Sequence, residues 1–210
     1  MLIASRQFFT TKNNLPYYEV QWIETDGVAS YINTGIKSSY DMKIVLDFQT
    51  MTLPTDVHSA LCGARYDETL ASGRRFAILV SQRYETFYAA RPTVGASSGF
   101  PFDTQRHVVT LDMGYMILDG VSKETTVQPT DGFNEDFTIG KDGVMDAATS
   151  PSRCYGDARF YSVKIYKNNV LVFDGIPVKV GSNGCMYDNI SKVVLSNAGS
   201  GVITPGPKKT

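Results

Sequence analysis

The chain has 210 residues, of which 42% are apolar and 11% aromatic, so it can bury a sizeable core without a metal or disulfide staple. Its 20 basic and 21 acidic residues leave a net charge of −1, and no basic run exceeds the terminal Lys208 and Lys209, which argues against nucleic acid as a partner. The odd count of cysteines at wide spacing predicts neither a full disulfide set nor a zinc site, and we expect reduced thiols in or near the core at Cys62, Cys154 and Cys185.

Residues 1–16 are predicted to form an arm outside the core, because Asn and Pro residues near its end break regular structure. The arm contains neither the basic and apolar regions of a signal peptide nor a run long enough to span a membrane. We therefore expect synthesis in a cytosol and no membrane insertion. Exposed apolar side chains are typical of a contact surface, and a frayed terminus without a role is the alternative. The apolar residues expected to anchor the arm to a neighbour are Phe8, Phe9 and Leu15.

Short strand patterns recur along the rest of the chain, with almost no helical periodicity. In the first half, strands are predicted at 17–24, 30–36, 43–50, 60–65, 76–81 and 85–90. In the second half, strands are predicted at 107–112, 115–118, 137–140, 186–190 and 193–196, with a long loop at 145–157. This spacing predicts a single all-β sandwich or jelly roll over residues 17–204, followed by a tail at 205–210.

The stretch 158–180, ARFYSVKIYKNNVLVFDGIPVKV, is predicted to be the hairpin around which the sandwich is built. Alternation places Tyr161 on the same face as the apolar residues that follow it in the first strand. Asn168 and Asn169 tolerate the positive φ of a tight hairpin turn. The return strand begins with four apolar residues, which predicts cover on both faces. Pro177 is expected to end the strand ladder because it has no N–H.

Four stretches carry recognisable motifs: RHVVTLD with YMILDG at 106–120, YINTGI at 31–36, FYSVKIY with Ile-Pro at 160–177, and MYD with SNAGSG at 186–201. Together they resemble the laminin-G-like, concanavalin A-like lectin and glucanase domains, in the version common in gut bacteria (Bacteroidota) and their phages. Arg106 stands where that family usually has Trp. The resemblance covers 17–207 and implies a jelly-roll β-sandwich, with sugar or protein binding only as a tendency.

The motif glycines have structural explanations. Asp119 and Gly120 suit a type I′ hairpin turn, and Asn197 and Gly199 are expected to adopt positive φ in a turn. These motifs therefore predict the fold more than the function.

The sequence does not meet the requirements of two known catalytic motifs, the hydrolase elbow and the glucanase carboxylate pair. Residues 95–99 match G-x-S-x-G, with Ser97 at the centre, but that elbow needs a strand before the Ser and a helix after it, which Pro101 blocks. We predict a flexible loop there, and His107 as a strand residue that hydrogen-bonds across the sheet. The E-x-D-x-E string that would place two glucanase carboxylates on one face does not occur in the sequence. The protein is therefore not expected to be an enzyme.

Candidate ligand-binding residues are mid-chain aromatic and basic side chains, because sugar rings stack on aromatic faces and Arg hydrogen-bonds hydroxyl groups. The alternative is that most of them are core or edge residues, since Tyr is common in strands. The candidates are Tyr66, Tyr84, Tyr88 and Arg91.

No cofactor is expected, although one acidic loop offers oxygen ligands of the kind that calcium binds. A solvated acidic loop is the alternative, because the spacing fits no defined calcium-binding loop. The candidate metal ligands are Asp131, Asn134 and Asp136.

We interpret the sequence first as a non-catalytic phage virion protein, with a lectin-like domain for assembly and host-glycan attachment. Virion proteins leave the cell by lysis and need no export signal. Its expected partners are other virion proteins, further copies of itself and a host surface glycan. The alternative is a bacterial carbohydrate-binding module, and a glycan-cleaving enzyme is the least favoured. Outside a virion, a cytoplasmic location is expected.

Overall fold

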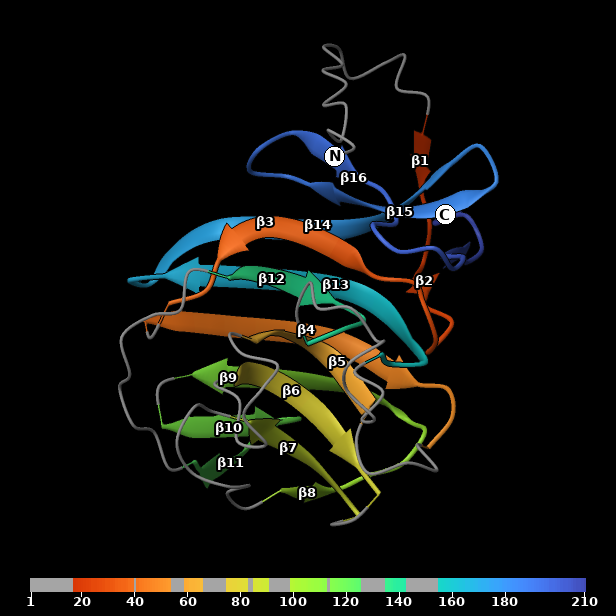
Figure 1. Ribbon diagram of the computed structural model, residues 1–210. Helices are drawn as coiled ribbons and strands as arrows, with labels where there is room; N and C mark the ends of the chain where they lie inside the picture. Colours follow the sequence, from red (N-terminus) through yellow and green to blue (C-terminus); the bar gives the residue numbers. More distant parts are fainter. Residues whose placement is uncertain are drawn as a thin grey trace.

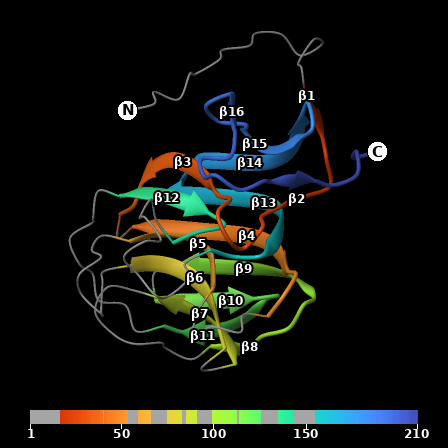
Figure 2. The same cartoon turned by 45° about the vertical axis from the view of Figure 1, so that its right-hand side comes forward.

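The computed structural model describes residues 17–39, 41–53, 59–65, 75–82, 85–90, 99–112, 114–125, 135–142 and 155–210 (Figure 1). Within these ranges the chain forms two antiparallel sheets that pack face to face, which confirms the predicted all-β sandwich. The turned view in Figure 2 shows the same two layers. No helix in the described part of the chain has the length and apolar character that a membrane span requires.

The larger sheet runs in the order β11 (Val121–Glu124), β10 (Tyr115–Leu118), β9 (Arg106–Asp112), β4 (Met42–Thr50), β13 (Ala158–Lys167), β14 (Val170–Val180), β15 (Asn183–Asp188) and β16 (Val193–Leu195). Three short strands join its side: β1 (Tyr17–Glu19) pairs with β14, and β2 (Ile23–Glu24) pairs with β13 and β17 (Thr204–Pro205). The smaller sheet runs in the order β3 (Ile32–Lys37), β12 (Asp136–Ile139), β5 (Ser59–Arg65), β6 (Arg75–Ser81), β7 (Thr86–Ala90) and β8 (Phe100–Pro101).

The core lies between the two sheets. Along β4, every second residue is buried and the residues between them are half-buried, as the sequence pattern predicts for a strand with one open face. Phe48 of β4 meets Phe87 of β7 edge to face, with ring centroids 5.4 Å apart. This aromatic pair joins the larger sheet to the smaller one across the core.

The predicted hairpin is central to the larger sheet. Asn168 and Asn169 have φ of 47° and 61°, which confirms the predicted tight turn. Asp119 and Gly120 have φ of 48° and 84° and form the corresponding turn between β10 and β11. Local turn chemistry was therefore sufficient to place both turns.

The predicted face of Tyr161 is wrong. The pairing of β13 with β4 shifts by one residue between Phe160 and Ser162, which is a β-bulge. Phe160 is fully buried in place of Tyr161. The Tyr161 hydroxyl donates instead to Oε1 of Gln49, 2.9 Å away, on the outer face of the sheet. Because a bulge adds a residue without changing the local composition, strict alternation along the sequence cannot reveal it.

Pro177 does not end the ladder, because β14 continues to Val180 and Pro177 pairs with Met186 of β15. The carbonyl of Pro177 accepts from the N–H of Val20, 3.1 Å away. The N–H and C=O of one strand residue point to the same side, so the missing N–H faces Val20 and takes no bond from β15.

Two further strand predictions need correction. Among the first four residues of β14, only Phe173 is fully buried, and Val170 is 63% exposed, because the outer face of this sheet is open. The strand predicted at 17–24 is two strands, since β1 pairs with β14 whereas β2 pairs with β13 and β17. The short strands β8, β11 and β17 were not predicted, because two to four residues carry too little periodic signal.

The motifs at 31–36 and 196–201 form one unit, although they lie at opposite ends of the chain. The Asn197 side chain accepts from the N–H groups of Tyr31 and Gly199, both 3.0 Å away. Its amide donates to the carbonyls of Gly199 and Gly201. Neither Asn197 nor Gly199 has the positive φ that the sequence predicts. The Asn197 side chain holds this loop through its bonds, so the loop does not need a left-handed residue.

Candidate functional site

A row of polar side chains crosses the outer face of the larger sheet at one end of four strands. Arg106, Gln49, Arg159 and Glu24 are successive Cα partners on β9, β4, β13 and β2, so their side chains share one face. Four adjacent strands about 4.8 Å apart make this row about 14 Å long. With the side chains that contact the row, we name it the outer-face strip: Trp22, Glu24, Asp47, Gln49, Arg106, Arg159 and Tyr161.

Arg106 forms one end of the strip. Its Nε and Nη2 both donate to the Asp47 carboxylate at 2.8 Å, and its guanidinium lies 3.8 Å from the centre of the Tyr161 ring. Gln49 accepts from the Tyr161 hydroxyl and donates to the carbonyl of Thr104, 3.0 Å away. The Arg106 side chain is 55% exposed, so its orientation is set by these partners while its remaining N–H groups face solvent.

Arg159 repeats the arrangement at the other end. Its guanidinium lies 4.1 Å from the centre of the Trp22 ring, and its Nε donates to Glu24 at 2.6 Å. Gly206 packs so closely on Trp22 that an added Cβ would overlap the ring. The single tryptophan of the chain is therefore held in place between an arginine and the C-terminal backbone.

The chemistry of the strip suits a neutral, hydroxyl-rich ligand. Each arginine is balanced by its own carboxylate, Asp47 or Glu24, so the strip carries no net charge. The guanidinium and amide groups offer planar hydrogen-bond donors, and beside them Trp22 and Tyr161 are half-buried, so the parts of the rings that the arginines and Gly206 leave uncovered offer apolar surface. Sugars combine the same two features, because one side of the ring presents C–H groups while its edge presents hydroxyls.

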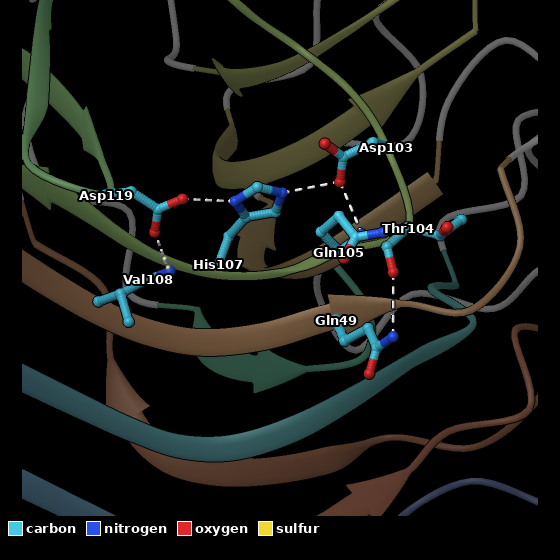
Figure 3. Close-up of polar contacts among 7 residues, drawn as sticks. All are labelled: Gln49, Asp103, Thr104, Gln105, His107, Val108 and Asp119. Carbon is cyan, nitrogen blue, oxygen red and sulfur yellow. Dashed lines mark hydrogen bonds and ion pairs between the residues drawn. The ribbon is translucent and has the colours of Figure 1, made fainter.

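On the opposite, core-facing side of the same sheet, His107 of β9 lies between two carboxylates (Figure 3). Its Nδ1 is 2.6 Å from Asp119, in the turn after β10, and its Nε2 is 2.8 Å from Asp103. The carboxylates also accept backbone N–H groups, Asp119 from Val108 and Asp103 from Gln105. His107 is a strand residue, as predicted, but its side chain bonds to the loop before β9 and to the turn after β10 rather than across the sheet.

The His107 ring is positively charged when both of these bonds are made, because each carboxylate requires a donor. Burial lowers the pKa of His107, but the bonds to Asp119 and Asp103 outweigh this effect and raise it above the usual 6.5. The pKa values of Asp103 and Asp119 are lowered below 3.8, since their bonds to His107 outweigh the opposing effect of burial. With both nitrogens committed, His107 has no lone pair for proton transfer.

We expect this cluster to make folding stability depend on pH. The contribution of His107 is fully present below about pH 6.5 and is lost as the pH rises through its raised folded-state pKa. The contribution of Asp103 and Asp119 is present above about pH 3.8 and is lost as the pH falls through their lowered values. Urea unfolding should therefore show a stability maximum between these limits.

The measurement is made in a His58→Gln background, so that His107 is the only histidine. Adding His107→Gln should abolish the loss of stability between pH 5 and pH 8. An equal loss in both proteins would contradict the assignment to this cluster.

Comparison with known proteins identifies solved structures with a similar fold. No protein-family model matches the chain, and no curated protein matches it in sequence. A candidate carbohydrate-binding protein from Bacteroides ovatus has a similar structure, with a TM-score of 0.57 and 9% identity over 91% of this chain and 61% of that protein. The chain has a lectin-like sandwich fold. At this identity, the likeness supports the fold alone.

Two structures of Trypanosoma rangeli sialidase also overlap with this lectin-like sandwich. The complex with sialic acid has a TM-score of 0.45 and 15% identity, and the covalent intermediate with 2,3-difluorosialic acid has 0.41 and 13%. In both cases the match covers 62% of this chain and 21% of the sialidase. The chain thus spans less than two thirds of the solved proteins that it resembles.

Most of the predicted ligand-binding residues lie outside the described residues. These are Tyr66, Tyr84 and Arg91. Also outside the description are Ser97 of the G-x-S-x-G match and the predicted arm residues Phe8, Phe9 and Leu15. The backbone of Tyr88 lies in β7 and pairs with Leu79, but its side chain is also outside the description. These assignments stay predictions.

Of the predicted calcium ligands, Asp131 and Asn134 also lie outside the described residues. Asp136 bonds to the Lys37 ammonium at 2.9 Å and to the Asn33 amide at 3.0 Å. In the part of the chain that the structure describes, no group of three or more His, Cys, Asp or Glu could hold a metal ion.

The predicted reduced thiols are confirmed at two positions. Cys62 and Cys185 are free and buried. Burial raises the pKa of the Cys62 thiol to about 12 and that of Cys185 to about 11. Both therefore remain protonated and unreactive at neutral pH. Cys154 lies outside the described residues.

Sequence reasoning missed the outer-face strip. Alternation along β4 placed Asp47 and Gln49 outward, which was a signal of a polar outer face. The row itself depends on strand register, because Arg106 and Glu24 lie far apart in sequence.

Proposed function

We propose that this lectin-like sandwich is a non-catalytic carbohydrate-binding module that holds a neutral oligosaccharide along the outer-face strip. The observation that carries the proposal is the charge-balanced row with an arginine stacked on an aromatic ring at each end, Arg106 on Tyr161 and Arg159 on Trp22. The similarity in fold to the candidate carbohydrate-binding protein of Bacteroides ovatus supports it.

The strip is organised before any ligand binds. Arg106 and Arg159 each make a charge-assisted bond and a ring contact, so little side-chain freedom is lost on binding. At about 14 Å, the strip is long enough for more than one sugar ring. It is an open face of a sheet, which suits an internal segment of a glycan chain better than the end of one.

A non-catalytic role agrees with the state of the acidic groups. Asp47 and Glu24 are each bonded to an arginine, and Asp103 and Asp119 are bonded to His107. A glycosidase needs one carboxyl group whose pKa is raised so that it can donate a proton. The pKa values of Asp103 and Asp119 are lowered instead.

The virion surface role and the cytoplasmic origin stay predictions, and the geometry favours the carbohydrate-binding alternative. The two readings are compatible, since a virion protein can bind a host glycan. Mass spectrometry of purified phage particles tests the location: the protein should be present in them if it is a virion component.

Binding is tested with Trp22, whose fluorescence reports directly on the strip. Titration with neutral oligosaccharides should give a saturable change in the emission of this single tryptophan. Tyr161→Ala should weaken binding about tenfold, because removal of an aromatic contact in a binding site costs about 1.4 kcal/mol.

Tyr166→Ala is the matched control. Tyr166 is also half-buried on β13 and has the ammonium of Lys43 5.7 Å from its ring centre, but it lies outside the strip. Its replacement should leave the affinity unchanged. Equal affinity in the Tyr161→Ala protein would exclude the strip as the binding site.

A further inference from the structure

A pocket of about 300 Å³ lies between the start of β15 and the loop that follows β16, and none of its lining residues belongs to the strip. The residues on the β14 and β15 side are Val180, Asn183, Gly184 and Cys185. The residues on the loop side are Ser196, Asn197, Gly201, Val202 and Ile203.

The walls of this pocket are held by hydrogen bonds. The N–H of Gly184 donates to the carbonyl of Ile203 at 2.8 Å, which ties β15 to the loop. The N–H of Val202 donates to the Asp26 carboxylate at 3.1 Å, and Asn197 closes the loop on itself. The pocket is therefore formed before a ligand enters, as small-molecule sites usually are.

The lining of the pocket selects the chemistry of its ligand. None of the lining residues carries a charge, so a charged ligand would lose its hydration without gaining a partner. The floor is apolar, since Cys185 and Ile203 are only 3% and 2% exposed. Asn183 and Ser196 are exposed at the rim and offer hydrogen-bonding groups there.

We propose that this pocket binds one uncharged terminal sugar that bears a methyl group, as in an N-acetylated or a 6-deoxy sugar. The methyl group fills the apolar floor, and the ring hydroxyls reach Asn183 and Ser196 at the rim. A volume of about 300 Å³ is at the small end of ligand pockets, which fits a single sugar rather than a chain. The choice of a sugar rests on the proposed carbohydrate-binding function, but the site is separate from the strip.

The probes are N-acetylglucosamine and L-fucose, with glucose as the sugar that lacks a methyl group. Backbone amide chemical shifts of the ¹⁵N-labelled protein are followed during each titration. N-acetylglucosamine, L-fucose or both should cause saturable shifts at Gly184, Cys185 and Ile203, and glucose should cause at least tenfold weaker ones. No saturable shift from either methyl-bearing sugar, or equal affinity for glucose, would overturn the proposal.

Two variants block the pocket, and one serves as a control. Ser196→Trp and Val202→Trp each place an indole at the rim and should reduce the affinity at least tenfold. Ser200→Trp changes an exposed serine of the same loop that does not line the pocket, and it should bind as the wild type does. Unchanged affinity in both blocking variants would also overturn the proposal.

The Tyr161→Ala protein separates this inference from the proposed function. It should keep the shifts at Gly184 and Cys185 while binding oligosaccharide at the strip about tenfold more weakly. Pocket binding without any strip binding would refute the proposed function alone, whereas strip binding without pocket shifts would refute this inference alone.

Discussion

Replacing Phe48 with alanine is expected to lower the free energy of unfolding by about 3–5 kcal/mol, the usual range for removing a buried phenylalanine ring. Phe48 is fully buried on β4, meets Phe87 of the opposite sheet edge to face, and lies 6.1 Å from the His107 ring centre. Its loss would leave a cavity where the two sheets meet. Because the rings around the cavity belong to different sheets, they cannot close it without moving the sheets together.

Urea unfolding followed by circular dichroism measures the effect. Val45→Ala is the matched control, since Val45 is half-buried on the outer face of the same strand. It should change the free energy of unfolding by much less, at most about 1 kcal/mol. Similar losses in the two variants would contradict the assignment of the β4 faces.

Gly199→Ala is expected to lower the free energy of unfolding by about 3 kcal/mol, at the upper end of the range for overpacking. An added Cβ at Gly199 would overlap the carbonyl oxygen of Ala29, which belongs to the backbone and cannot rotate away. The loop would have to separate from the N-terminal segment. That movement would break the bond between the Gly201 N–H and the Ala29 carbonyl and would strain those made by Asn197.

Two measurements check this prediction. The free energy of unfolding of Gly199→Ala is compared with that of Ser200→Ala, whose exposed position should keep the change within about 0.5 kcal/mol. Hydrogen exchange should become faster at the Tyr31 and Val202 amides, which are bonded to Asn197 and Asp26. If exchange there stays as slow as in the wild type, the contact between the two segments is not what requires glycine.

The features that depend on neighbouring residues in the chain could be predicted from the amino-acid sequence. The alternation along β4 predicted which of its side chains are buried, because successive strand residues point to opposite faces. The Asn168 and Asn169 turn followed from the tolerance of asparagine for positive φ. Strand alternation and turn residues each act within a few neighbouring residues. Enough of them could be recognised in the sequence to predict a β-sandwich.

Which strands are neighbours, and in what register they pair, became known only from the folded structure. The Pro177 strand continues because its missing N–H faces Val20, which the sequence around Pro177 does not show. The bulge at Tyr161 turned that ring to the outer face. The candidate site depends on both register and bulge, because Arg106, Gln49 and Arg159 come from three separate parts of the chain. Alternation tells which side of a strand a residue is on, but only the pairing of distant strands places such residues in one row.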